Sequence, residues 1–209
     1  MMIIKKEDWD RKYVIPYYED TDFPYIPITA NVDVTKPLQF ARDNKISFNL
    51  TMVYLANSVA DSIINYRYRL LENGDILVID HNIPTINHLR KGIDAFVIGE
   101  GIWPCDDIVK FCKETHAHLE QCEVEDNLTV NSRQEVLNYT SIPWINYTGF
   151  MRTIPKFGPY SNPKISFGKY AEQNGRILMP VSSQTHHMLM DGRHVGQFYE
   201  KLQAACENI

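Results

Sequence analysis

The chain has 209 residues, of which 44% are hydrophobic and 22% are charged, and its formal net charge is −5. This length and composition predict a single compact domain, residues 1–209, with a sizeable apolar core. The acidic balance argues against a nucleic-acid partner, because phosphate binding needs clustered Lys and Arg. The apolar runs are too short to span a membrane, and the N-terminal segment does not resemble a signal peptide, so we expect a cytoplasmic protein without a membrane partner.

The first third of the chain is rich in aromatic residues. Residues 1–20 contain Trp9, Tyr13, Tyr17 and Tyr18, and they predict the start of an amphipathic helix that buries aromatic side chains. Prolines followed by alternating apolar residues over 23–34 are typical of a loop that leads into a strand. The pattern then predicts one helix that starts at residue 35 or 37 and ends near 44, and a broad-faced helix over 47–65.

The middle of the chain predicts a hairpin, more sheet and a third helix. Asn73-Gly74 lies between two apolar runs and predicts a two-residue hairpin turn. Residues 84–102 alternate as strands do, and residues 105–122 repeat at helical spacing. The pattern over 137–150 predicts a core strand that includes Pro143-Trp144, and the Pro, Gly and Ser residues of 152–163 predict a loop.

The stretch from 176 to 203 carries the clearest chemical signal. An apolar run leads to His186-His187, Asp191-Gly192 follows, and apolar residues then recur at helical spacing, so the prediction is strand, turn and helix. A histidine is well suited to accept a proton near neutral pH, and Asp191 can begin a helix. On spacing alone, a surface turn and a catalytic site both remain open.

The string QTHHMLMDG at residues 184–192, followed by RHVGQFYEKLQ, resembles the active-site signature of the chloramphenicol acetyltransferase family. That signature is His-x-x-x-Asp-Gly preceded by a second histidine. Features that agree in order lie across nearly the whole chain, namely Trp9-x-Arg11, the Asn73-Gly74 hairpin, Pro143-Trp144 and Gly168-Lys169-Tyr170. The resemblance implies an α/β two-layer sandwich of a mixed sheet with helices, and a homotrimer with active sites at subunit interfaces. It also implies transfer of an acetyl group from acetyl-CoA to a hydroxyl of chloramphenicol or a similar small molecule, which confers antibiotic resistance.

The resemblance also implies roles for single residues. His187 would be the general base, with Nδ1 held by a backbone carbonyl, and Arg11 would form an ion pair with Asp191. Thr140 stands where the family has a serine that stabilises the oxyanion, with Ser141 as the fallback. The acceptor alcohol would contact Tyr17, Tyr18, Ile26, Asn87, Phe96 and Asn138. Coenzyme A would contact Lys169, Tyr170 and Trp144, and no metal is expected.

Four other interpretations remain open from the sequence. A dihydrolipoamide acyltransferase core shares the motif, but the chain has no lipoyl domain or Ala-Pro linker. A peptide-synthetase condensation domain needs two such sandwiches. A trimeric protein that binds small molecules without catalysis is a third interpretation, and a metal site formed by His186, His187, Asp191 and His194 is a fourth. The cysteines at 105, 112, 122 and 206 lack the paired spacing of a zinc site and are expected to be free thiols.

Overall fold

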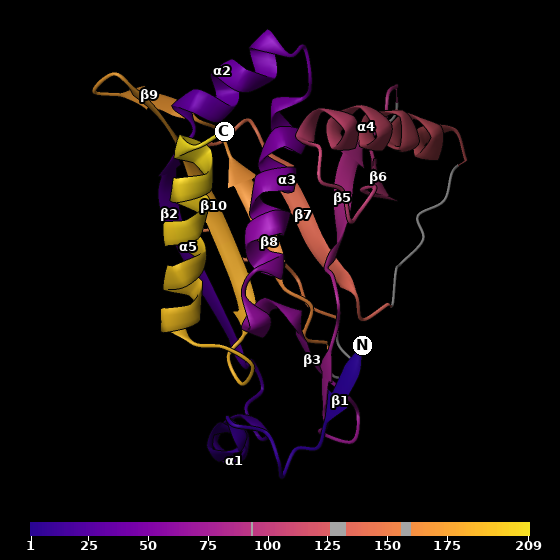
Figure 1. Ribbon diagram of the computed structural model, residues 1–209, viewed down its shortest axis with the longest axis vertical. Coiled ribbons are helices and arrows are strands. Elements are labelled where there is room, and N and C mark those ends of the chain that lie inside the picture. Colours follow the sequence, from indigo (N-terminus) through magenta and orange to yellow (C-terminus); the bar gives the residue numbers. More distant parts are fainter. Residues whose placement is uncertain (93, 126–132, 156–159) are drawn as a thin grey trace.

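The computed structural model describes residues 1–92, 94–125, 133–155 and 160–209. In these ranges the chain forms a two-layer α/β sandwich, as expected, with helices packed on one face of a mixed sheet (Figure 1). No helix within the described ranges is long and apolar enough to cross a membrane.

The large sheet has the strand order β2-β10-β8-β7-β5-β6, and β9 pairs with β10 beside this path. Strands β7 and β8 are parallel, as are β5 and β7, whereas the other pairs are antiparallel. The strands are β2 (Tyr25–Asp33), β5 (Ile83–Leu89), β6 (Phe96–Glu100), β7 (Val136–Ile142), β8 (Lys164–Gly168), β9 (Ala171–Gln173) and β10 (Arg176–His186).

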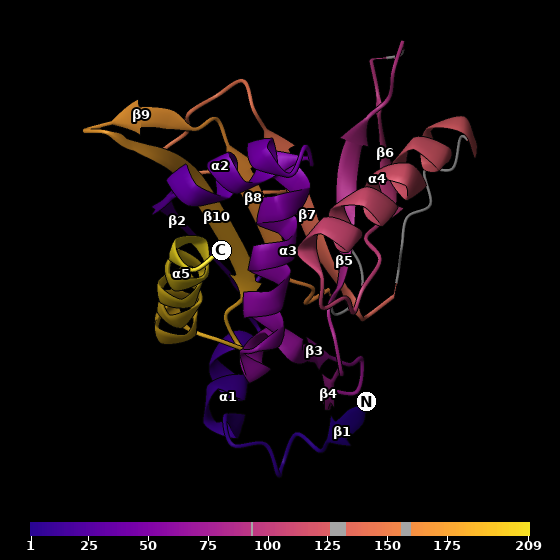
Figure 2. The ribbon, with the colours of Figure 1, turned by 45° about the horizontal axis from the view of Figure 1, so that its top comes forward.

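Helices cover one face of this sheet (Figure 2). They are α2 (Thr35–Asp43), α3 (Phe48–Asp61), α4 (Ile108–Glu125) and α5 (Gly192–Glu207). Their apolar sides and alternate residues of the strands, such as Leu137, Tyr139 and Phe167, form the main core. Because neighbouring residues of a strand point to opposite faces, Asn138 and Thr140 lie on the other side. We call that side the open face.

A second, smaller sheet supports the end of β10. It has the order β1-β4-β3 and consists of β1 (Met2–Ile4), β3 (Tyr68–Leu70) and β4 (Ile76–Val78). The short helices η1 (Lys12–Val14), α1 (Ile15–Tyr18) and η2 (Ile64–Arg67) lie in adjoining segments. A separate apolar cluster forms here and includes Trp9, Tyr68, Met188 and Leu189. The turn after β10 therefore packs against the small sheet as well as being joined to the large one.

Three local predictions were wrong. The strand expected to include Pro143-Trp144 ends at Ile142, and Trp144 is 68% exposed. The N-terminal segment buries Trp9, whereas Tyr13 and Tyr17 are 83% and 76% exposed. The turn at Asn73-Gly74 is a three-residue loop, because the backbone N–H of Leu71 donates to the carbonyl of Asp75 (2.9 Å) and only residues 72–74 lie between them.

Candidate functional site

The turn after β10 holds His187 by backbone hydrogen bonds. The N–H groups of Leu189 and Met190 donate to the carbonyl of His186 (3.0 and 3.2 Å), and the N–H of His187 donates to that of Pro24 (2.7 Å). The amide of Asn65 donates to the carbonyl of Leu189 (3.0 Å). These bonds tie the turn to β2 and to the segment after α3, so a rigid scaffold carries the imidazole.

The ring of His187 is half-buried and stacks on Tyr18, with centroids 4.8 Å apart and an interplanar angle of 22°. Its Nδ1 atom is buried and has no hydrogen-bond partner among the described residues. The expected bond from Nδ1 to a backbone carbonyl is therefore absent from this part of the chain, and that prediction was wrong. Stacking and the backbone bonds, rather than a carbonyl acceptor, orient the ring here.

Asp191 begins α5 and joins three groups. Its carboxylate accepts from the backbone N–H of Arg193 (3.0 Å), and its Oδ2 lies 3.1 Å from Nη1 of Arg11, which is the predicted ion pair. The ring of His194 lies 3.0 Å from Oδ1. Burial alone would raise the pKa of this carboxyl, but Arg11, His194 and the N–H of Arg193 together lower it.

The packing of Trp9 holds Arg11 close to Asp191. The indole is 1% exposed and meets the ring of Tyr68 edge-on, with centroids 5.8 Å apart. It belongs to the same cluster as Met188 and Leu189. Arg11 also approaches the carbonyl of Met188 with its Nε atom (3.4 Å). The Trp-x-Arg element is therefore a structural brace for the histidine turn.

Thr140 lies on the open face, near the end of β7. Its Oγ1 atom is buried and has no hydrogen-bond partner among the described residues, so the hydroxyl is free to donate to a ligand. Ser141 points to the opposite face and donates to the side chain of Asn49. Between the two hydroxyls, only that of Thr140 lacks a protein partner.

Thr140 and His187 of one chain lie far apart. The register pairs Thr140 with Ser166 and Ser166 with Ser182, so Thr140 is level with Ser182. His187 follows Ser182 by five residues, or about 16 Å at about 3.3 Å per residue, and two strand spacings add about 10 Å across the sheet. A separation of roughly 15–20 Å means that these two groups of one chain cannot contact the same reacting carbonyl.

The residues predicted to bind coenzyme A line one cavity. Trp144, Lys169 and Tyr170 lie around a space of about 520 Å³ between α3 and the ends of β7 and β8. Asn87 and Ser141 also line it. The ring of Tyr170 meets Phe48 edge-on at 5.6 Å, and the N–H of Lys169 donates to the carbonyl of Ile145 (2.8 Å). The sequence-predicted group is therefore assembled within one chain.

Gly168 ends β8 and lines this cavity. A Cβ built at Gly168 would lie 2.6 Å from Pro180 and 2.8 Å from the ring of Tyr147. Both distances are shorter than real Cβ contacts allow, so no larger residue fits without movement. The glycine therefore allows the end of β8, just before Lys169 and Tyr170, to pack closely against Pro180 and Tyr147.

The residues predicted to contact the acceptor fall into two separate groups. Tyr17, Tyr18 and Ile26 lie on α1 and β2, near the end of β10 that carries His187. Asn87, Phe96 and Asn138 lie on β5, β6 and β7. Asn138 shares the open face with Thr140, whereas Asn87 lines the cavity around Trp144, Lys169 and Tyr170. Phe96 is 48% exposed on the edge strand β6. The residues predicted to contact the acceptor are thus separated within one chain, as are the predicted base His187 and the predicted oxyanion donor Thr140.

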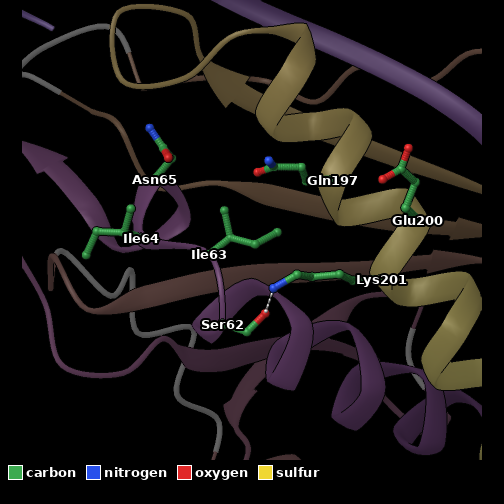
Figure 3. Close-up of a pocket in the computed structure, with 7 residues that line it drawn as sticks. All are labelled: Ser62, Ile63, Ile64, Asn65, Gln197, Glu200 and Lys201. Carbon is green, nitrogen blue, oxygen red and sulfur yellow. Dashed lines mark hydrogen bonds between the residues drawn. The ribbon is translucent and has the colours of Figure 1, made fainter.

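Two further cavities contain residues that the sequence did not single out. One lies between the end of α3 and α5, is lined by residues such as Asn65, Gln197 and Glu200, and is crossed by a hydrogen bond from Lys201 to Ser62 (3.1 Å) (Figure 3). It contains none of the predicted site residues. The other, of about 630 Å³, is lined by Arg152, Tyr160 and His186.

The charged side chains of Arg152, which is half-buried, and Lys164, which is buried, were missed by the sequence analysis. Both belong to the open face: Lys164 pairs with Asn138, and Arg152 donates to the carbonyl of Asn138 (3.1 Å). The alternation Lys164, Ser166, Gly168 could have placed the lysine on this face once β8 was assigned. Its burial could not have been predicted, because lysine is rarely fully buried.

The histidine-rich turn has no metal-binding arrangement. Within the described ranges, no group of three His, Cys, Asp or Glu side chains could hold a metal ion. When His194 is neutral, its Nδ1 atom accepts from the backbone N–H of Asp191 (3.2 Å) and completes the cap of α5. When His194 is protonated, the same atom faces Oδ1 of Asp191 at 3.0 Å.

Two solved structures share this fold. The chain superposes on a solved chloramphenicol acetyltransferase with a TM-score of 0.83 and 24% identity, covering 98% of both chains. It also superposes on the truncated catalytic core of a 2-oxoacid dehydrogenase multienzyme complex from Thermoplasma acidophilum, with a TM-score of 0.71, 16% identity and 95% of both chains. The fold is thus shared with a chloramphenicol acetyltransferase and with this catalytic core.

The sequence comparisons show which family the chain belongs to. The family model described as chloramphenicol acetyltransferase matches residues 1–203. A chloramphenicol acetyltransferase from Clostridium perfringens is 26% identical, and one from Vibrio anguillarum is 24% identical. Each comparison covers 99% of this chain and 94% of the relative. The chain belongs to the chloramphenicol acetyltransferase family and is an acyltransferase.

Proposed function

We propose that this protein is a CoA-dependent O-acetyltransferase that moves an acetyl group from acetyl-CoA to a hydroxyl of chloramphenicol or a similar small molecule, and so confers antibiotic resistance. Family membership supports the reaction class, and curated relatives named for chloramphenicol support the acceptor. The four cysteines are thiols that form no disulfide among the described residues, which supports a reducing, cytoplasmic compartment. The activity belongs to one domain, residues 1–209.

The proposed mechanism needs a base and an oxyanion donor. Nε2 of His187 takes the proton of the acceptor hydroxyl, and the oxygen attacks the thioester carbonyl carbon. The hydroxyl of Thr140 donates to the oxyanion that develops there. When the carbon–sulfur bond breaks, the imidazolium returns its proton to the leaving thiolate. General-base catalysis contributes typically 10² to 10⁴ in rate, and one oxyanion donor about 10² to 10³.

Trp144, Lys169 and Tyr170 are proposed to hold coenzyme A in the cavity between α3 and the ends of β7 and β8. A lysine suits a phosphate as a compact positive charge, and the two aromatic rings can stack on the adenine. Thr140 lies on the opposite face from this cavity. The thioester therefore reaches it past the end of β7, where Pro143-Trp144 leaves the sheet.

The observation that carries this proposal is the separation of His187 from Thr140 within one chain. A base and an oxyanion donor about 15–20 Å apart become one site only if they come from different chains. We propose a homotrimer in which each interface joins the His187 side of one protomer to the Thr140 side of the next. A head-to-tail interface of this kind closes into a ring.

Complementation between two inactive variants tests the proposal. His187→Ala and Thr140→Val chains are each expected to lose most of their activity, measured by thiol release from acetyl-CoA with chloramphenicol and a panel of other primary alcohols. After both are unfolded and refolded together at equal amounts, about a quarter of the interfaces receive two intact halves, so activity returns. The control is the double variant His187→Ala/Thr140→Val, unfolded and refolded in the same way, which should stay inactive.

The outcomes separate the parts of the proposal. Sedimentation gives the oligomeric state, and native mass spectrometry shows whether mixed trimers form. Mixed trimers without activity would remove the interface site. Full activity of His187→Ala alone would remove the base. Wild-type protein that binds acetyl-CoA but transfers to none of the alcohols would favour a trimeric small-molecule-binding protein.

A further inference from the structure

Lys164 begins β8 and is 5% exposed, yet its charge is not neutralised. Its Nζ atom lies 3.9 Å from the centroid of the Tyr160 ring. Among the described residues it has no hydrogen bond and no ion pair with a carboxylate. A cation over an aromatic face gains a few kcal/mol at most, which is less than the cost of burying an unpaired charge.

Arg152 brings a second cation to the same place. Gln184 holds its backbone on both sides, accepting from its N–H (2.7 Å) and donating to its carbonyl (3.2 Å). No carboxylate of the described residues lies within ion-pair distance of its guanidinium. Burial lowers the pKa of Arg152, and burial together with the charge of Arg152 lowers the pKa of Lys164 to about 7.

Arg69 is a buried cation with a structural role, and its hydrogen bonds can be compared with those of Lys164. Its guanidinium is fully buried and donates to the carbonyls of Gln134, Tyr66, Tyr68 and Val136 and to the side chain of Asn82. Protein oxygens surround that charge. Among the described residues, Lys164 has no such shell of oxygen atoms. Its charge is therefore available to an anion from outside the described chain.

The two cations lie next to the residues proposed for the acceptor. Gln184, Lys164 and Asn138 form one row across three strands, and Thr140 follows Asn138 on the same face, about 7 Å further along the strand. The amide of Asn138 donates to the hydroxyl of Tyr160 (3.0 Å). An acceptor with its reacting hydroxyl at Thr140 would thus extend toward Lys164.

The cavity beside this row contains another unused polar atom. Arg152, Tyr160 and His186 line it. His186 is 5% exposed, and its Nδ1 atom has no partner among the described residues. Asp22 also lines the cavity, but it is exposed and forms no ion pair with Arg152 in the described chain. The lining therefore includes a polar atom, Nδ1 of His186, that has no partner among the described residues.

We infer that the acceptor alcohol of this enzyme carries an anionic group, such as a carboxylate, phosphate or sulfate, which Lys164 and Arg152 bind on the open face. This inference rests on the proposed function and names its substrate class. The anionic group lies on the order of 7–10 Å from the reacting hydroxyl, as the strand geometry requires. A carboxylate of a neighbouring protomer is the competing source of negative charge.

A matched pair of acceptors tests the inference. The neutral acceptor is chloramphenicol, and the anionic one is its analogue in which a carboxylate replaces the aromatic nitro group, because the two groups have nearly the same shape. The wild type is expected to show at least a tenfold higher kcat/KM for the carboxylate analogue. Lys164→Met and Arg152→Met are each expected to reduce that preference, the ratio of the two kcat/KM values, about tenfold, whereas Lys164→Arg keeps the positive charge and most of the preference. Lys201→Met removes a charge elsewhere and serves as the control.

Calorimetry with the carboxylate analogue gives a second measurement that does not depend on turnover. Binding that Lys164→Met weakens about tenfold supports the anion site even if no acetyl transfer occurs, in which case only the proposed function fails. Equal kcat/KM for both acceptors in the wild type overturns the inference. So does a Lys164→Met variant that dissociates into monomers and loses activity with both acceptors alike, since that result assigns Lys164 to a carboxylate of the neighbouring protomer.

Discussion

Tyr18 and His187 stack face to face, with ring centroids 4.8 Å apart and planes inclined by 22°. Nδ1 of this histidine has no hydrogen-bond partner among the described residues, so the stack is the main side-chain contact that fixes the imidazole plane. Tyr17 meets Tyr18 edge-on at 4.8 Å and is itself exposed. The orientation of the proposed base thus depends on α1.

Removing the ring of Tyr18 is therefore expected to slow the chemical step. In Tyr18→Leu the imidazole can rotate, and a small misplacement of a catalytic group costs about tenfold or more in kcat. Tyr18→Phe keeps the stack and retains most of the activity. Steady-state kinetics with acetyl-CoA measure both, with Tyr13→Leu as the control because Tyr13 is 83% exposed. Equal kcat for the Leu and Phe variants would show that the stack is dispensable.

Asp191 is expected to contribute to stability in a pH-dependent way. Its pKa in the folded chain is lowered below the ordinary 3.8, so its contribution is present above that value and is lost as the pH falls through the folded pKa. Asp191→Asn keeps a good helix cap but removes the ion pair with Arg11, and its acid unfolding curve is flatter. Asp191→Ala also loses the cap, at about 1 kcal/mol.

Urea unfolding between pH 2 and pH 7 measures this difference. Arg11→Ala should resemble Asp191→Asn in its pH dependence, because both break the same pair at 3.1 Å. Both variants should also lose activity, since the turn that carries His187 depends on this pair. Parallel curves for the wild type and Asp191→Asn would mean that the pair does not govern acid stability.

Thr140 is expected to matter for turnover but not for stability. Its Oγ1 atom has no partner among the described residues, so Thr140→Val, which keeps the shape, removes no internal hydrogen bond. Turnover falls about 10² to 10³ if the hydroxyl stabilises the oxyanion, and Thr140→Ser retains it. Thr51→Val is the control for stability, because it loses the hydrogen bond that its hydroxyl donates to the carbonyl of Ser47 (2.9 Å). Unchanged turnover in Thr140→Val excludes the oxyanion role.

Lys164 is expected to make the protein less stable at low pH. Burial lowers its pKa from 10.5 to about 7, so between these values the unfolded chain binds more protons and stability rises with pH. Below about pH 7 both states are protonated, and the full penalty, on the order of 3–5 kcal/mol, applies. Lys164→Met removes it. The variant should gain stability over the wild type at pH 6 and much less at pH 10.

Chemical unfolding of the acceptor-free protein at the two pH values measures that gain. An equal gain at pH 6 and pH 10 would show that the effect comes from apolar packing by methionine rather than from a buried charge. Lys201→Met, which removes an exposed charge that bonds to Ser62, should show no such pH dependence.

Periodic patterns predicted most of the elements. The helix expected over 47–65 is α3, and the strand, turn and helix expected over 176–203 are β10, the His187 turn and α5. The hairpin at Asn174-Gly175 was missed although it carries the same signal as Asn73-Gly74. Both of its residues have positive φ, 53° and 78°, and β9 pairs with β10 around it. This is the two-residue turn that Asn-Gly favours.

The errors have physical causes that a local pattern does not contain. Trp144 is apolar and follows a strand, but β7 ends at Ile142 and the exposed indole lines the cavity proposed for coenzyme A. Burial of Lys164 depends on Tyr160, four residues away in sequence, and on Arg152 in the segment that crosses the open face. The bond predicted for Nδ1 of His187 depended on a backbone detail that resemblance alone could not supply. Side-chain partners across the sheet decide each case.

Strand β7 separates two compartments, since Thr140 lies on the open face and Ser141 lines the cavity proposed for coenzyme A. Its side-chain pattern has a period of two, so deleting a single residue within the strand would reverse every side chain beyond it. Tyr139 would then leave the core and the row containing Asn138 would turn inward. Point substitutions can thus retune either compartment on its own, whereas a one-residue change in the length of β7 would disable both together.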